Sequence, residues 1–186
     1  MVSSTHAPCR VVVPPLTCAT FDELIDMVRG AMSIEAVRAR FGRDSVLFDS
    51  DVEVEESSAH HASVELPACG IELSLHRDVS TTGSFAVRAA FLHGGGYQGY
   101  EAFGEALPLG VAFGVTYDDL MRRAPAETGG GVGYSELLSR PYPRWMRYRL
   151  ADVVMHLEFD VDDELSLVTL MRDDDPALPS RAPSPS

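Results

Sequence analysis

The chain has 186 residues, of which 45% are hydrophobic, enough for one large domain or for two small lobes that share a core. Its formal net charge is -13, and all fifteen of its basic residues are Arg. This acidic balance argues against binding of nucleic acid, whose backbone is itself anionic, and favours a basic partner or simple solubility.

The cysteines predict the redox environment. Cys9, Cys18 and Cys69 are odd in number and lack metal-ligand spacing, so we expect buried, unpaired thiols in a reducing compartment. No apolar run approaches the ~20 residues of a membrane span, and the N-terminus has no basic region followed by an apolar core. These observations predict a soluble, cytoplasmic protein without a membrane partner.

Two helices are predicted near the N-terminus, after a frayed segment 1–10. The string Thr20-Phe21-Asp22-Glu23 fits a capping box, and Gly30 supplies a stop for the first helix. The second helix begins after Ser33 and ends at Gly42, so the two form an αα-hairpin. Their apolar positions recur at helical spacing: Phe21, Leu24, Ile25 and Val28, then Ile34, Val37 and Phe41.

The segment 44–58 is predicted to hold a strand, and it carries six acidic residues without a base. One interpretation is an edge strand whose charges prevent pairing with another sheet. The other is a surface that faces a partner.

Three strands with short connections follow, and they predict an antiparallel meander, because a parallel return needs a long crossover. The residues expected on its buried face are Ala62, Val64, Leu66, Ile71, Leu73, Leu75, Phe85, Val87, Ala89 and Phe91. The glycine-rich segment 94–106 then reads as a joint, since it lacks the Lys and Ser or Thr of a phosphate-binding loop.

A second unit repeats this pattern from residue 107. Thr116 is the expected N-cap of a helix, and laid on the first unit it corresponds to Ser33. A second meander follows, with these residues on its buried face: Met146, Tyr148, Leu150, Val153, Met155, Leu157, Phe159, Leu165, Leu167 and Met171.

The duplication predicts an α+β fold. Two tandem helix-plus-antiparallel-meander units, 11–93 and 107–172, would form one broad antiparallel sheet with helices on one face. The acidic, Pro- and Ser-rich tail 173–186 is predicted to be disordered. The helix-free face would be charged and wet, with the side chains Glu65, Glu72, Arg88, Arg147, Arg149, His156 and Glu158.

No pattern of residues predicts catalysis, a cofactor or a metal site. His60 and His61 are adjacent and would point apart in a strand, and the chain has no His-x-x-x-His pair on a predicted helix. There is no Gly-x-Ser-x-Gly motif, and the acidic run 158–164 lacks the glycine of a calcium loop. We therefore expect a protein that is not an enzyme, although an enzyme of unknown type stays a third alternative.

The string Leu107-Pro108-Leu109-Gly110-Val111-Ala112-Phe113-Gly114, followed by a short helix and the strands from Trp145 to Met171, resembles a module of bacterial immunity proteins. Those proteins neutralise polymorphic toxins. The tandem of helix and meander also resembles the architecture of the β-lactamase inhibitory protein. The resemblance implies a protein ligand, and no binding residue is carried over from it.

The leading functional hypothesis is therefore an immunity-type inhibitor that occludes the active site of a basic toxin domain. Its partner-binding surface is predicted to combine ten acidic residues: Asp49, Asp51, Glu53, Glu55, Glu56, Glu158, Asp160, Asp162, Asp163 and Glu164. The alternative is an acidic secretion chaperone or adaptor, which would bind an extended effector segment in an apolar groove.

Overall fold

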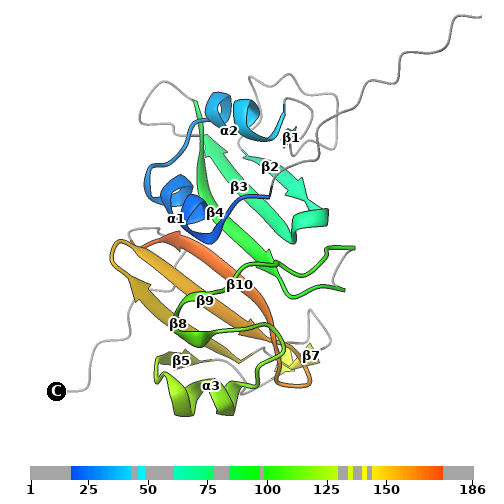
Figure 1. The fold of residues 1–186 in the computed structure, drawn as a ribbon, viewed down its shortest axis with the longest axis vertical. Coiled ribbons are helices and arrows are strands. Elements are labelled where there is room, and N and C mark those ends of the chain that lie inside the picture. The colour runs from blue at the N-terminus through cyan, green and yellow to red at the C-terminus, as the bar shows by residue number, and fades with distance from the viewer. Residues whose placement is uncertain are drawn as a thin grey trace, which may run out of the picture.

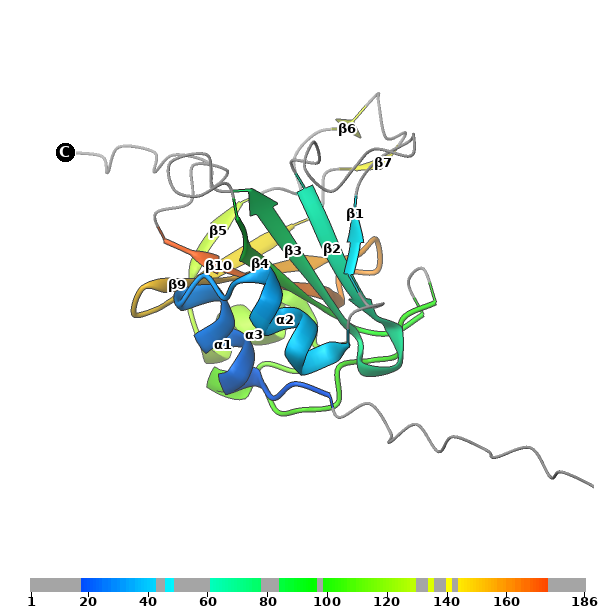
Figure 2. The ribbon, with the colours of Figure 1, turned by 90° about the horizontal axis from the view of Figure 1, so that it is seen from above.

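The computed structural model describes residues 18–42, 46–48, 61–77, 84–96, 99–129, 134–135, 140–141 and 144–173. Within these ranges, helices cover one face of a broad antiparallel sheet (Figures 1 and 2). The helices are α1 (Phe21–Arg29), α2 (Ile34–Phe41) and α3 (Tyr117–Arg123), with short 3-10 turns η2 (Pro67–Cys69) and η3 (Pro108–Gly110). The strands are β1 (Val46–Phe48), β2 (His61–Leu66), β3 (Ile71–Arg77), β4 (Phe85–His93), β5 (Glu127–Gly129), β6 (Tyr134–Ser135), β7 (Arg140–Pro141), β8 (Trp145–Leu150), β9 (Val153–Phe159) and β10 (Leu165–Arg172).

The main sheet has eight strands in the order β1-β2-β3-β4-β10-β9-β8-β5, and all its neighbours are antiparallel. The two predicted meanders, β2-β3-β4 and β8-β9-β10, therefore join through their last strands. Figure 2 places all three helices on one side of this sheet and the separate β6–β7 pair on the other. The predicted fold class is confirmed.

Local sequence explains where the helices begin. The Thr20 side chain accepts a hydrogen bond from the Glu23 amide, and the Glu23 carboxylate accepts one from the Thr20 amide, so the predicted capping box is present. Ser33 and Thr116 cap α2 and α3 in the same manner, with one side-chain bond each. These caps satisfy amide groups that a helix start leaves without partners.

Backbone hydrogen bonds show that the two units are built alike. In the first unit, the Val87 amide donates to the Met32 carbonyl, one residue before the Ser33 cap, at 2.9 Å. In the second, the Leu165 amide donates to Val115, one residue before the Thr116 cap, also at 2.9 Å. Val87 and Leu165 thus occupy equivalent positions, as the alignment of Ser33 with Thr116 predicts.

A β-bulge follows each of these two positions. The register of β3 and β4 shifts between the pairs Leu75–Val87 and Ser74–Ala89, so Arg88 is an extra residue. The register of β9 and β10 shifts in the same way, and there Ser166 is the extra residue. The repeat therefore reproduces an irregularity of the strand as well as its pairing.

The bulges reverse the expected facing of four residues. Ala90, Leu92, Val168 and Leu170 face the core, each fully buried, whereas Ala89, Phe91, Leu167 and Met171 face away from the helices and are half-buried. The prediction for these last four residues was wrong, because strict alternation of faces assumes a strand without an inserted residue.

One hydrophobic core runs under both units. Leu24 and Val28 of α1 are fully buried, and α1 contacts β4, β10 and β9. The first helix thus covers the junction between the two meanders. Each large apolar side chain buried there contributes about 1.5–3 kcal/mol, so the junction is held by the core and by the β4–β10 ladder together.

The segment after β4 turns back along the first unit. The Phe103 amide donates to the His93 carbonyl and the Glu101 amide to Pro67, both at 2.9 Å. This path passes close to Gly70, where a Cβ atom would lie 2.5 Å from the Glu101 oxygen. Gly70 also has a φ of +65°, so both its conformation and its surroundings require glycine.

Cys18 and Cys69 form a disulfide that joins the segment before α1 to the turn η2. The prediction of unpaired thiols was wrong for these two residues. An odd count excludes a complete set of pairs, and it does not exclude one pair with one residue left over. Cys9 lies outside the described residues.

Several predictions also fall outside them. These concern the frayed segment 1–10, most of the acidic segment 44–58 and the tail from Asp174 onward.

Candidate binding surface on the helix-free face

A row of side chains crosses the helix-free face of the sheet from one unit to the other. Successive cross-strand pairs place in line Glu65, Glu72, Phe91, Thr169, His156 and Arg147. Phe91 and Thr169 are equivalent in the two units, so the pseudo-twofold axis passes through their pair. Glu65 and Glu72 then correspond to Arg147 and His156, and the row is acidic on one side of the axis and basic on the other.

On the basic side, aromatic and charged groups pack together. The Arg147 guanidinium lies 5.0 Å from the centre of the Trp145 ring, and the His156 ring lies 5.3 Å from it. His156 Nε2 is 3.7 Å from the Glu158 carboxylate. Burial, and secondarily the charge of Arg147, lowers the pKa of His156 to about 4, so the imidazole is neutral at neutral pH.

On the acidic side, the Tyr100 ring stacks on His93 with the ring centres 4.0 Å apart. The pKa of Tyr100 rises to about 12, because of burial first and then of the charges of Glu72 and Glu65. His93 Nε2 lies 3.8 Å from Glu72. Tyr100, which comes from the segment after β4, therefore holds the carboxylate side of the row in place.

The prediction of a wet, charged face is only partly right. Register places Glu65, Glu72, Arg147, Arg149, His156 and Glu158 on this face as expected, and Arg88 at the bulge. However, Arg147 is only 7% exposed, Thr169 only 3%, and Val154 is fully buried. Large neighbours such as Trp145 and Met171 crowd these positions, an effect that period-two reasoning does not include.

The predicted acidic turn between β9 and β10 is structurally fixed. Asp160 Oδ1 accepts hydrogen bonds from the amides of Asp162 and Glu164, both at 3.0 Å. Asp163, with a φ of +65°, binds Arg144 at 2.5 Å. Asp160 and Asp163 thus stabilise the turn, whereas Asp162 and Glu164 are exposed.

Arg144 anchors this turn to α3. Its guanidinium lies 3.4 Å from the centre of the Tyr117 ring, and it also binds Asp118 at 3.1 Å. Val161, at the tip of the turn, is 80% exposed. The turn therefore carries an exposed apolar side chain together with exposed carboxylates, a feature that acidic composition alone did not indicate.

The other predicted acidic cluster cannot be placed beside this turn. Asp49, Asp51, Glu53, Glu55 and Glu56 lie outside the described residues. The proximity of the two clusters thus stays a prediction.

Histidines also meet at the β2–β3 pair, where the His61 and His76 ring centres are 5.0 Å apart. His61 Nε2 is 2.9 Å from the Ser74 hydroxyl. Among the described residues, no three His, Cys, Asp or Glu side chains gather in a way that could hold a metal ion.

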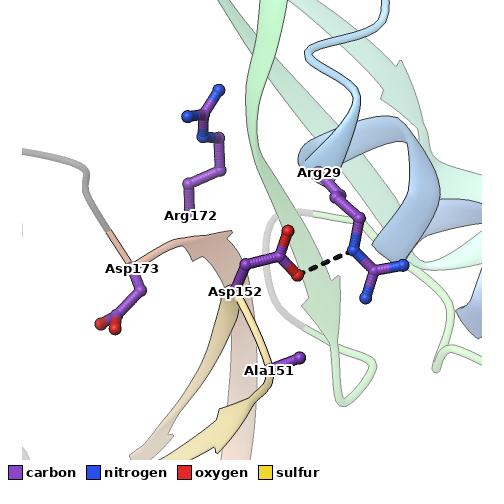
Figure 3. Close-up of a pocket in the computed structure, with 5 residues that line it drawn as sticks. All are labelled: Arg29, Ala151, Asp152, Arg172 and Asp173. Atoms are coloured by element: carbon purple, nitrogen blue, oxygen red, sulfur yellow. Dashed lines mark hydrogen bonds and ion pairs between the residues drawn. The ribbon is translucent and has the colours of Figure 1, made fainter.

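A shallow pocket of about 460 Å³ lies at the junction of the units (Figure 3). Arg29 of α1 reaches Asp152 of the β8–β9 turn at 2.8 Å, and Arg172 and Asp173 lie at the end of β10. The hydrogen bond from Arg29 lowers the pKa of the Asp152 carboxyl. This contact joins the first unit to the second, and we assign it a structural role.

In the described part of the chain, no helix combines the length and apolar character that crossing a bilayer requires.

No protein-family model matches the sequence. Two solved structures show partial similarity to this chain. One is an extracellular protein from Bacillus anthracis that contains an SCP domain, with 13% identity, a TM-score of 0.44, and coverage of 91% of this chain. This chain spans 50% of the length of that protein. The other is a DUF4309 family protein, YjgB, from Bacillus subtilis, with 14% identity, a TM-score of 0.42, and coverage of 81% of this chain and 96% of the other.

Proposed function

We propose that this protein is an immunity-type inhibitor that binds a basic bacterial toxin domain and occludes its active site. The observation that carries the proposal is the fixed turn at Asp160–Glu164, which carries the exposed residues Val161, Asp162 and Glu164. A preorganised element loses little conformational entropy on binding. Net charge of -13 favours rapid encounter with a cationic protein.

The chaperone alternative has less support. A secretion chaperone needs a contiguous apolar groove for an extended segment. Among the described residues, the exposed large hydrophobic side chains are Leu47, Leu109 and Val161, each on a different element of the chain. An enzymatic function also has little support, because the Ser74–His61 contact is not part of any catalytic pattern in the sequence.

The cellular compartment is part of the proposal. The expectation of the cytoplasm rested in part on unpaired thiols, and the Cys18–Cys69 disulfide removes that part of its basis. Disulfides form and persist in oxidising compartments. We therefore infer that the inhibitor meets its toxin outside the reducing cytoplasm.

The test uses the toxin domain encoded by the neighbouring gene, purified as a catalytically inactive variant. We expect a 1:1 complex whose association rate falls about tenfold or more in the Asp162→Asn, Glu164→Gln double variant, with a weaker salt dependence. The matched control is Asp22→Asn with Glu35→Gln, which changes net charge equally on exposed positions of α1 and α2. Absence of a complex would reject the function, and equal rates in both double variants would reject the turn as its surface.

A further inference from the structure

The two bulges create a feature on the helix-free face that period-two alternation does not predict. Ala89 and Phe91 of β4, with Leu167 and Met171 of β10, form an apolar stripe along the seam of the two units. We name it the seam stripe. Cross-strand pairing along the β4–β10 ladder sets Ala89 opposite Met171, Phe91 opposite the buried Thr169, and Leu167 opposite the buried His93. All four apolar side chains are half-buried, which leaves part of each accessible.

The charges that border the seam stripe are unequal in their accessibility. Glu65 is exposed, and the side chains of Glu72 and Glu158 are 29% and 37% exposed. Of the basic residues, Arg147 is 7% exposed, exposed Arg149 is bound to Asp173, and half-buried Arg88 lies at the bulge beside Ala89. A molecule that approaches this face therefore meets an apolar centre with an acidic border.

This arrangement matches the anatomy of a protein interface, in which an apolar centre is enclosed by a polar rim. We propose that the seam stripe is a docking surface for a folded, cationic protein, which places an apolar side chain against Phe91 and a Lys or Arg against Glu65 and Glu72. Glu158 belongs both to this border and to β9, the strand that leads into the Asp160–Glu164 turn. The seam stripe thus continues the surface proposed above, and its occupant is the same toxin domain, so the inference rests on the proposed function.

The position of Glu72 suits a cation from the partner. Its carboxylate is held by Tyr100, and it lies beside Phe91 in the row, so a partner cation would contact a fixed acid and an aromatic ring. Glu65, directly opposite Glu72 on β2, adds a second carboxylate at the exposed edge of the same row.

Two single substitutions test the surface, with binding to the inactive toxin domain measured by calorimetry. Phe91→Ala should weaken the complex about tenfold or more, since an aromatic anchor at an interface centre is lost. Glu65→Lys should weaken it by a similar factor, and Asp22→Lys on α1, with an equal change of charge on the helix side, should leave affinity within about twofold. Thermal unfolding of each variant confirms that it remains folded.

Photo-cross-linking gives a second measurement that does not depend on affinity. In a Cys9→Ser background, a benzophenone attached at Ala89→Cys should form a covalent adduct with the toxin domain, and one at Ala39→Cys, exposed on α2, should not. If the complex forms but neither substitution weakens it and Ala89→Cys gives no adduct, the seam stripe is not the docking surface and the proposed function stands. If no complex forms, both proposals are rejected.

Discussion

At the scale of single residues, His156 is the side chain whose protonation the fold opposes most clearly. Its ring lies 5.3 Å from that of Trp145, and its buried Nδ1 atom has no hydrogen-bond partner among the described residues. The positive charge of Arg147 further disfavours protonation of His156. The folded protein therefore favours the neutral imidazole.

This environment predicts a loss of stability in mild acid. The pKa of His156 is about 4 in the folded protein and 6.5 ordinarily, so the unfolded chain binds more protons between these pH values. The contribution of neutral His156 to the free energy of unfolding is fully present above about pH 6.5. It falls by up to about 3 kcal/mol as the pH drops toward 4. Urea unfolding at several pH values measures this, and His156→Gln should flatten the curve between pH 6.5 and 4.5. A slope that survives this substitution would assign the effect to another group.

Residue-level reading of the sequence succeeded where a local signal was strong. Thr20 and Glu23 form the predicted capping box, and Ser33 and Thr116 are the predicted caps. It failed for Cys18 and Cys69, because their contact closes a loop of 51 residues that no local pattern specifies. It also missed Tyr100, whose role depends on a chain segment that folds back beside Glu72.

At the scale of elements, the equivalent bulges in β4 and β10 are the most informative feature. Arg88 follows Val87, and Ser166 follows Leu165; the amides of Val87 and Leu165 bond to the segments before two helix caps. Beyond each bulge, the positions that face away from the helices are shifted by one residue. A bulge inserts one residue without reversing the faces of its neighbours on the partner strand. The strand therefore keeps its core contacts although its sequence no longer alternates.

Deletion of Arg88 should consequently be tolerated. Without it, Val87 and Ala90 still face the core and Ala89 still faces away, since the strand becomes regular. We expect cooperative unfolding with a loss of at most about 3 kcal/mol, measured by chemical denaturation.

Deletion of Ser74 in β3 is the contrasting change. It would move one half of the strand to the opposite face, so Leu75 would leave the core, and we expect no cooperative transition. Equal stability of the two deletion variants would contradict the assignment of Arg88 as the bulge residue.

At the scale of the whole molecule, the units are held together by the β4–β10 ladder, by α1 across their junction and by the Arg29–Asp152 contact. The Cys18–Cys69 disulfide adds a restraint within the first unit, between the chain entering α1 and the end of β2. It limits the unfolded chain chiefly by closing a long loop.

Reduction of this disulfide should lower the free energy of unfolding by about 2–4 kcal/mol. Urea unfolding with and without a phosphine reductant measures the change, with Cys9→Ser present in both samples so that the remaining thiol plays no part. The Cys18→Ser, Cys69→Ser double variant should show the reduced value in either condition. If reductant leaves the stability of the Cys9→Ser protein unchanged, Cys18 and Cys69 are not paired in solution.

The sequence by itself determined the fold class, because apolar residues at periods of 3.6 and two, together with helix caps and turn residues, are local signals that occur twice in the chain. It also determined the equivalence of the units, from Ser33 and Thr116. Tertiary structure alone decided that the meanders join through β4 and β10, and that two bulges turn Phe91 and Met171 away from the core. Those outcomes depend on which strands pair and in what register, and pairing is set by contacts between residues that lie far apart in the sequence.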